Sequence, residues 1–272
     1  MTVQITDDFD LTKIAQSGQC FRWNPVSDGE YRIIHAGNCL YIRQSGKTEY
    51  CIDCTPEQFH TLWKPYFDLA ENYGKIRARI DRQQDSFLYE AAEDQKGIRI
   101  LQQDPWETLI SFIISQNKNI PAIKKSVELL ARYAGGKLMD SYDKEYYAFP
   151  TPEAIAAMRE EDLTACKVGY RWKYIKAAAN DILNGNLNLA KLLHTEEAET
   201  IQKLTEVYGV GIKVANCVSL YGLHHTDAFP IDIWVKRILA DKYPNGYPFE
   251  SYSPYNGIYQ QYLFAYYRKQ FT

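Results

Sequence analysis

The spacing of apolar residues changes from a strand-like to a helix-like period along the chain. Between about residues 5 and 55, apolar and polar positions alternate in short runs separated by glycine-bearing turns, which is typical of antiparallel strands. The clearest runs are Tyr31–Ile34, Leu40–Arg43 and Tyr50–Ile52. From Thr55 onward nearly every segment has helical spacing.

These patterns predict an α+β protein. We expect an N-terminal antiparallel β-sheet domain over residues 1–97 and a mostly α-helical region over residues 98–272. The chain has 272 residues, 46% of them apolar, which is enough for one large core or two modest ones and excludes a disordered protein.

Two helical patterns flank a glycine pair and predict a helix–hairpin–helix over about residues 196–223. The apolar residues with this spacing are Ile201, Leu204, Val207 and Tyr208 before the turn, and Val214, Cys217, Val218 and Tyr221 after it. The turn itself is Gly209-Val210-Gly211. Such a hairpin can aim unpaired backbone N–H groups at one DNA phosphate without any side-chain charge.

Lys213 and Asp232 are the candidate catalytic residues. Lys213 lies on the first turn of the second helix, where the positive end of the helix dipole favours the neutral amine, and a neutral amine can attack a sugar C1′ to form a Schiff base. Cys217 is four residues later and shares its helix face. Asp232, in a loop over 227–233, could stabilise an oxocarbenium-like sugar or move protons for the lysine. Taken singly, the lysine could be a solvated side chain and the aspartate a helix N-cap.

Two further segments have the composition of a base pocket. A turn glycine, Gly18, precedes a strand in the run SGQCFRW. Near the C-terminus, a helix over 254–270 places Gln260 and Phe264 on one face, which offers a ring for stacking and an amide that both donates and accepts. The alternative for this helix is a core stripe with an incidental glutamine.

Two polar turns complete the candidate DNA contacts. Asn117 lies in the turn SQNKN between two helices, where amides are ordinarily loop or cap residues. Tyr170 and Arg171 lie in KVGYRWK, and an exposed aromatic among cations suits stacking on unpaired bases.

The motifs together, above all GVGIK followed by PID, resemble the helix–hairpin–helix superfamily of DNA glycosylases, and more narrowly the 8-oxoguanine DNA glycosylase/AP lyases. The resemblance covers nearly the whole chain. It implies a helix–hairpin–helix glycosylase body, Lys213 as the nucleophile and Asp232 as the loop aspartate. It also implies that Gly18 senses the lesion through its carbonyl, which accepts the N7 hydrogen that 8-oxoguanine has and guanine lacks.

The remaining residues take their roles from the same resemblance. Cys217 and Phe264 would contact the base, and Gln260 would read its Watson–Crick edge. Asn117 would fill the space that the flipped base leaves. Tyr170 would be the wedge beside the opposing base, with Arg171 contacting that base.

Three positions depart from the family pattern. Lys118 stands where the family has its middle asparagine, Ala122 where animal members have an arginine that reads the opposing cytosine, and Trp234 where they have a histidine. Loss of one bidentate reader removes about 1–3 kcal/mol of base discrimination. We therefore expect a relaxed preference for cytosine opposite the lesion.

The net charge of −3 argues against a nonspecific nucleic-acid coat and leaves room for a local cationic patch. Its candidate members are Lys118, Lys124, Lys125, Arg171, Lys173 and Lys213. Of the six cysteines, only Cys51 and Cys54 have a metal-like spacing, and no second pair completes it. We expect no metal and no cofactor.

The predicted partner is damaged double-stranded DNA. No apolar run approaches the ~20 residues needed to cross a membrane, and we expect a monomer in the cytoplasm of a bacterium. Two alternatives stay open: a helix–hairpin–helix glycosylase for another oxidised or alkylated base, and a non-catalytic DNA-binding module that uses the hairpin as a phosphate clamp.

Overall fold

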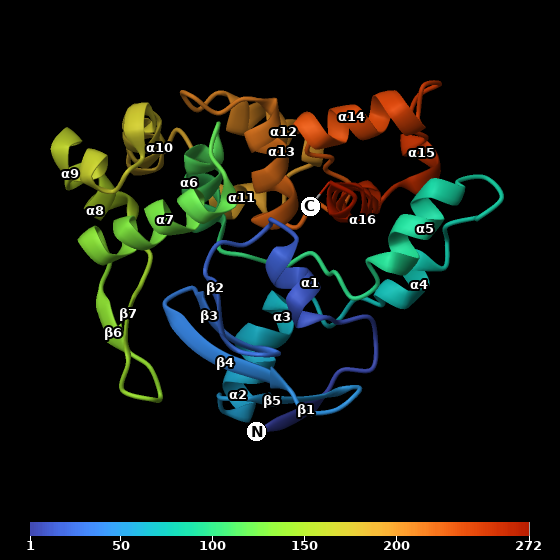
Figure 1. The fold of residues 1–272 in the computed structure, drawn as a ribbon. Helices are drawn as coiled ribbons and strands as arrows, with labels where there is room; N and C mark the ends of the chain where they lie inside the picture. The colour runs from blue at the N-terminus through green and yellow to red at the C-terminus, as the bar shows by residue number, and fades with distance from the viewer. Residues whose placement is uncertain (272) are drawn as a thin grey trace.

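Five antiparallel strands form a sheet at the N-terminal end of the chain, in the spatial order β1-β5-β4-β3-β2 (Figure 1). The computed structural model describes residues 1–271. The strands are β1 Thr2–Gln4, β2 Trp23–Ser27, β3 Glu30–His35, β4 Asn38–Gln44 and β5 Glu49–Ile52. Trp23 faces Ile33 across one pair and Ile33 faces Leu40 across the next, so three buried side chains stack along one face.

Short helices follow the chain between and after the strands. They are α1 Leu11–Gln16, α2 Pro56–Gln58, the π-helical turn η1 Phe59–Trp63, α3 Lys64–Tyr66, α4 Tyr73–Arg77 and α5 Ser86–Asp94. The first four pack beside the sheet, and α4 and α5 pack with the helical body. The aromatic rings of Trp63 and Phe67 pack on the buried face of the sheet beside Trp23.

The helical body follows α5 and makes up the rest of the described chain. Its elements are α6 Pro105–Ser115, α7 Ile120–Ala134, β6 Lys137–Met139, β7 Glu145–Tyr147, α8 Pro152–Ala157, α9 Glu160–Ala165, the 3-10 turn η2 Gly169–Arg171, α10 Trp172–Leu183, α11 Leu189–Leu192, α12 Glu197–Thr205, α13 Ile212–Tyr221, α14 Ile233–Lys242, α15 Phe249–Tyr252 and α16 Asn256–Lys269. The expected α+β class, a sheet followed by helices, is confirmed.

Two apolar cores divide the molecule. One lies under the sheet, and the larger one lies inside the helical body. The cores interleave around the predicted boundary near residue 98, because α4 and α5 contribute to the helical core whereas Leu101 contributes to the sheet core. The exact boundary stays a prediction.

The structure corrects the expected element types in two places. The segment expected to hold only strands contains α1, whose six residues are too few to show a helical period; Asp10 caps it by accepting a hydrogen bond from the Lys13 N–H. The region expected to be helical contains the β6–β7 hairpin, whose three-residue strands are equally short.

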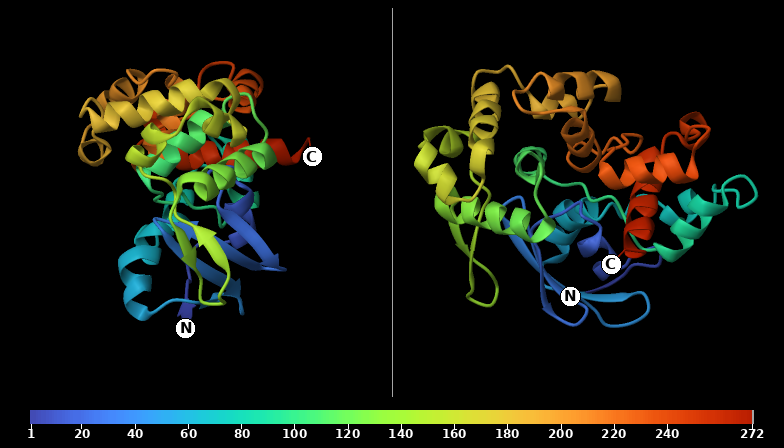
Figure 2. Two further views of the ribbon diagram at one scale, coloured as in Figure 1. Left: turned by 90° about the vertical axis from the view of Figure 1, so that its left-hand side faces the viewer. Right: turned by 45° about the horizontal axis from the view of Figure 1, so that its top comes forward.

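The β6–β7 hairpin reaches from the helical body to the sheet and lies beside it (Figure 2). Asp140 at its tip forms an ion pair with Arg32 of β3 at 2.8 Å and accepts a hydrogen bond from the Tyr41 hydroxyl. Tyr146 donates to the Gly37 carbonyl. These contacts fix the sheet against the helices that carry the pocket.

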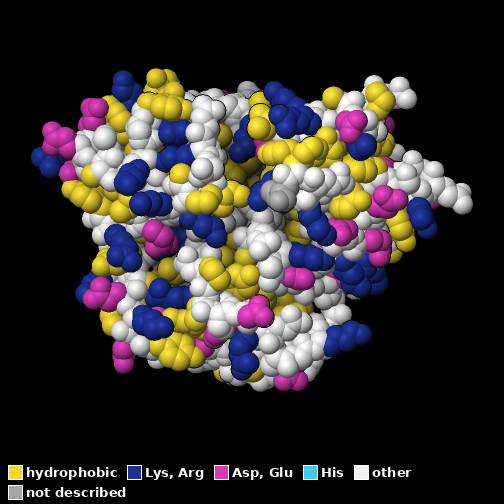
Figure 3. Space-filling view, in the orientation of Figure 1, with side chains coloured by type: hydrophobic (Ala, Val, Ile, Leu, Met, Phe, Trp, Pro, Cys, Tyr) yellow, Lys and Arg dark blue, Asp and Glu magenta, His cyan; other side chains and the backbone are white. Residues whose placement is uncertain are grey.

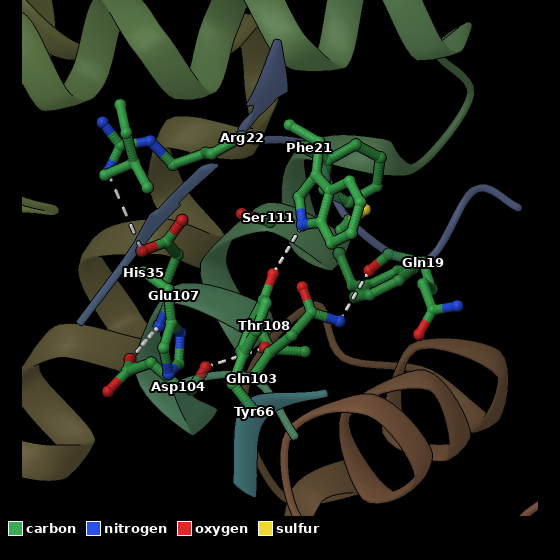
Figure 4. Close-up of a pocket in the computed structure, with 14 residues that line it drawn as sticks. Gln19, Phe21, Arg22, His35, Tyr66, Gln103, Asp104, Glu107, Thr108 and Ser111 are labelled. Atoms are coloured by element: carbon green, nitrogen blue, oxygen red, sulfur yellow. Dashed lines mark hydrogen bonds and ion pairs between the residues drawn. The ribbon is translucent and has the colours of Figure 1, made fainter. Parts of the chain in front are cut away.

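Arg22 makes a second connection between the two parts. Its guanidinium donates to Glu128 of α7 at 2.8 Å and to the Tyr147 carbonyl. It also lies 3.9 Å from Glu107 of α6 (Figure 4). Arg22 is 2% exposed. Burial raises the pKa of Glu107 to about 7, with Arg22 opposing the rise and Asp104 and Glu128 adding to it. Among the described residues, no helix is long and apolar enough to span a membrane.

The raised pKa of Glu107 predicts a pH-dependent contribution to stability. Because the folded-state value of about 7 lies above the ordinary 4.5, folding favours the protonated carboxyl. This contribution is complete below pH 4.5 and is lost as the pH rises through 7. Glu107→Gln should therefore raise the Tm relative to the parent protein at pH 8.5 and change it little at pH 5, as measured by calorimetry. The exposed Glu90→Gln control should show no such difference; equal Tm shifts for Glu107→Gln at both pH values would contradict the account.

Candidate active site

One pocket lies where the N-terminal turn meets α6, α13 and α16. Its lining residues are Ser17, Gly18, Phe112, Lys213, Cys217, Tyr221, Pro230, Asp232, Gln260 and Phe264. These include all six residues that the sequence marks as catalytic or substrate-binding. On the face of the molecule shown in Figure 3, a hollow with hydrophobic walls opens near the centre, and lysine and arginine side chains gather on both sides of it.

The hairpin positions the lysine. Gly209 has a φ of +85° and packs directly against the ring of Tyr174, so both its backbone and its surroundings require glycine. α13 then begins after Gly211, which supplies no side-chain cap, so the first amides of the helix are left for a ligand. Lys213 therefore lies on the first turn with its Nζ 5.2 Å from the centre of the Phe112 ring.

Cys217 lies one turn further along α13, at the back of the pocket. Burial raises the pKa of its thiol, while the neighbouring Lys213 opposes the rise and Asp232 adds to it. The thiol is therefore protonated at neutral pH and offers an apolar, polarisable surface to a bound ring. The three side chains are close enough to influence one another electrostatically.

Asp232 is both an N-cap and a pocket residue. Its Oδ1 accepts hydrogen bonds from the Trp234 and Val235 N–H groups at 2.9 and 2.8 Å, which starts α14. Its Oδ2 accepts no hydrogen bond from the described residues. The Asn216 side chain of α13 accepts a hydrogen bond from the Phe229 N–H. It therefore holds the loop that carries Asp232 (the aspartate loop) against α13, the helix that carries Lys213 (the lysine helix). The cap fixes one oxygen and leaves the other for the pocket.

The Gly18 turn is held from both sides. Gly18 has a φ of +85°, and no hydrogen bond from the described residues ends on its carbonyl. The Gln19 side chain donates to Ser17 and to the Arg99 carbonyl and accepts from the Leu101 N–H, which fixes the turn to the sheet side. From the helical side, Gln261 donates to the Ser17 carbonyl at 2.8 Å.

Gln260 and Phe264 come from α16 and face the lysine helix across the pocket. Gln260 is 4% exposed, and its Nε2 donates to the Pro230 carbonyl at 3.1 Å. Its Oε1 is buried without a partner among the described residues. A buried acceptor left unpaired costs about 1–3 kcal/mol, and a bound donor would recover that cost. The Arg268 guanidinium lies over the Phe264 ring, 5.6 Å from the ring centre.

The six predicted DNA-contact residues lie outside this pocket. Asn117 is exposed with a φ of +50°, and Tyr170 is half exposed; their side chains meet at 3.4 Å. Arg171, expected to contact the opposing base, is instead 6% exposed and donates to the carbonyls of Val168 and Gln116. The Arg171 guanidinium therefore points into the protein, and its contact with the opposing base stays a prediction.

The expected cationic patch is also smaller than its sequence suggests. Lys118 donates to the Ser126 hydroxyl and the Lys167 carbonyl, and Lys124 donates to the Trp23 carbonyl. With Arg171 these are three of the six candidate cations, and all three have internal partners. Among residues 1–271, no three or more His, Cys, Asp or Glu side chains come together as a metal site would require.

Sequence reasoning missed four pocket residues, Ser17, Phe112, Tyr221 and Pro230, and it also missed Gln261, which holds Ser17 in place. Phe112 lies in an apolar stripe and reads as core. Gln261 directly follows Gln260, and this pair of glutamines was the only sequence signal for it. The contact of Gln261 with Ser17, 244 positions away, could not be predicted because only the fold brings the two residues together.

The two hairpin glycines predict different tolerances to substitution. A Cβ at Gly209 would overlap the Tyr174 ring and strain a positive φ, whereas a Cβ at Gly211 would meet nothing within 4 Å. Gly209→Ala should lower the free energy of unfolding by about 2–4 kcal/mol, and Gly211→Ala by less than ~1 kcal/mol, as measured by urea denaturation. Equal losses would show that close packing on Tyr174 does not hold the hairpin.

Known proteins resemble this chain along most of its length. Residues 2–109 match the family described as 8-oxoguanine DNA glycosylase, N-terminal domain, and residues 110–245 match the HhH-GPD superfamily of base excision DNA repair proteins. An N-glycosylase/DNA lyase of Saccharomyces cerevisiae is 37% identical, over 86% of this chain and 68% of the yeast protein.

Two further relatives add to the comparison. A crystal structure of the 8-oxoguanine glycosylase/lyase of Clostridium acetobutylicum, bound to double-stranded DNA with cytosine opposite the lesion, has a TM-score of 0.91 and 35% identity, and covers 100% of this chain and 99% of that one. The N-glycosylase/DNA lyase of Arabidopsis thaliana is 29% identical over 83% of this chain, which spans 64% of the plant protein.

Proposed function

Because the chain belongs to the 8-oxoguanine DNA glycosylase/lyase family of the HhH-GPD superfamily, we propose that it excises 8-oxoguanine from duplex DNA and then nicks the abasic strand. The observation that carries the proposal is the meeting of Lys213, Asp232, Gly18 and Gln260 around one pocket. It brings a nucleophile, a carboxylate and acceptors for a base edge within reach of one nucleotide.

The reaction begins at Lys213. Its amine attacks C1′ of the flipped nucleotide, the N-glycosidic bond breaks, and the electron pair leaves with the base. Oδ2 of Asp232 faces the positive charge that develops on the sugar and stabilises it. Loss of a proton from the nitrogen and opening of the sugar ring give a Schiff base. Removal of a C2′ proton then expels the 3′ phosphate by β-elimination.

Base recognition follows from the acceptors in the pocket. The Gly18 carbonyl has no other partner among the described residues and can accept the N7 hydrogen that distinguishes 8-oxoguanine from guanine. The unpaired Oε1 of Gln260 can accept a hydrogen bond from the N1 or N2 side of the base. The base would lie between the Phe264 ring and the Cys217 thiol, where stacking recovers part of the cost of flipping.

The enzyme is further proposed to act as a monomer in a bacterial cytoplasm. One chain supplies the lysine, the aspartate and the base-contacting residues that the proposed chemistry needs, and all six cysteines are free thiols, as a reducing compartment favours. The likeness to a clostridial structure over almost its full length supports a bacterial source.

Borohydride trapping tests the chemistry. With a duplex that carries 8-oxoguanine, the parent protein should form a covalent adduct with the DNA, because borohydride reduces the Schiff base. Lys213→Gln should form none, and its base excision should fall by about two to four orders of magnitude. Lys47→Gln, a change of an exposed lysine in the turn between β4 and β5, is the matched control and should trap like the parent. Undiminished trapping by Lys213→Gln would assign the nucleophile elsewhere.

Opposite-base preference tests the consequence of Ala122 and the inward-facing Arg171. Neither position offers a guanidinium to an opposing cytosine. One bidentate contact to a base contributes about 1–3 kcal/mol of discrimination between bases. Without it, excision rates opposite cytosine and adenine should agree within about 10-fold in single-turnover assays. Ala122→Arg should increase the cytosine preference. A strong cytosine preference in the parent protein would refute the proposal.

A further inference from the structure

Three turns on the DNA-facing side, far apart in sequence, meet in one network. They are residues 116–119 between α6 and α7, residues 167–171 before α10, and residues 206–211 of the hairpin. Gln116 lies where all three join: its Nε2 donates to the Gly209 carbonyl at 3.0 Å, and its own carbonyl accepts from Arg171. One residue thus connects the hairpin to both polar turns.

Arg171 fixes the second of these turns against Gln116. Its guanidinium donates to the Val168 carbonyl at 3.1 Å and lies 4.5 Å from the centre of the Tyr170 ring. Tyr170 in turn meets the amide of Asn117. Asn117 and Tyr170, with their proposed roles in filling and wedging the opened duplex, are therefore held in place by the same contacts of Gln116 and Arg171.

Lys118 and Tyr174 strengthen the same junction. Lys118 donates to the Ser126 hydroxyl at 2.7 Å and to the Lys167 carbonyl, and both burial and the nearby Arg171 lower the pKa of its ammonium. The Tyr174 ring packs on Gly209 and lies edge-on to the rings of Tyr170 and Tyr208. The lysine that replaces the family's middle asparagine thus acts inside the protein.

We propose that Gln116 is a positioning residue that sets the distance between the phosphate-binding hairpin and the Asn117–Tyr170 pair. The proposal rests on the function proposed above. When the hairpin amides hold a phosphate of the damaged strand, the Gln116–Gly209 hydrogen bond transmits that position to the pair, which then stands at the base pair to be opened. Gln116 touches neither the sugar nor the base.

A space-filling role for Gln116 would not account for its contacts. The Gln116 side chain is only partly buried, so an apolar side chain could fill the same space. Water could then satisfy the Gly209 carbonyl, and space filling alone would therefore not require an amide donor here. The donor instead joins two turns that are 93 residues apart. Asn117 follows directly with a left-handed backbone, so any shift of Gln116 moves the Asn117 side chain as well.

The experiment compares two substrates that differ in the need to open a base pair. Gln116→Met keeps the length of the side chain and removes the donor. With 8-oxoguanine paired in a duplex, its single-turnover excision rate should fall by about 3- to 10-fold, the equivalent of one hydrogen bond. With a preformed abasic site, where no base has to be expelled, the nicking rate should stay within about 2-fold of the parent. Gln116→Asn, whose amide is one methylene too short, should behave in the same way.

Gln84→Met is the matched control, because Gln84 is exposed on the loop before α5 and lies outside these turns; it should leave both rates unchanged. Equal losses on the two substrates, or no loss on either, would overturn the positioning role. Failure of the parent protein itself to excise 8-oxoguanine or to nick abasic DNA would instead refute the proposed function, so the two failures are distinguishable. The Tm of each variant, measured beside the rates, separates unfolding from loss of positioning.

Discussion

The pocket depends on one buried amide. Gln261 is 1% exposed and accepts the Tyr221 hydroxyl of α13 through its Oε1 while its Nε2 donates to the Ser17 carbonyl. It therefore joins the lysine helix, the C-terminal helix and the N-terminal turn in a chain of two hydrogen bonds. Removing either partner would leave a buried polar group unpaired, which costs about 1–3 kcal/mol, so the three elements are held in one relative arrangement.

This arrangement explains why the sheet is part of the active site although it supplies only a turn. The sheet carries no catalytic side chain, yet it fixes the turn that ends in Gly18. The Arg22 ion pairs and the β6–β7 hairpin hold the sheet against α6 and α7, and the Gln19 hydrogen bonds hold the turn against the sheet. The proposed recognition of the lesion through the Gly18 carbonyl requires such rigidity, because a carbonyl on a mobile turn would accept water as readily as the base.

Much of the site could be predicted from the sequence because its signals are local. Gly209 and Gly211 between two helical periods mark the hairpin, the apolar run after Asp232 marks its cap, and the four-residue spacing of Gln260 and Phe264 places them on one face. Each of these depends on residues within a few positions. The family resemblance then supplied the roles, which no spacing could have given.

What could not be predicted depends on contacts between distant segments. No local pattern predicts that a lysine or arginine in a polar turn points inward, yet Lys118 donates to the Lys167 carbonyl and Arg171 to the Gln116 carbonyl, each in another turn. The short α1 and the β6–β7 strands have too few residues to show a period. Gln261 reads as the less informative neighbour of Gln260 until the fold brings Ser17 beside it.

The internal use of these cations changes how the protein must bind DNA. With a net charge of −3 and three of the six candidate cations committed to internal contacts, less side-chain charge is available to the DNA backbone than the sequence suggests. The amides at the start of α13 have no side-chain cap, and in the proposed binding mode they hold a phosphate through hydrogen bonds and the helix dipole. Counterion release scales with the number of phosphates neutralised by cations, so affinity that depends on amides falls less steeply with salt. Lys118 and Arg171 instead order the turns beside the hairpin. These two side chains thus fix the geometry of the turns rather than add to the general electrostatic attraction for DNA.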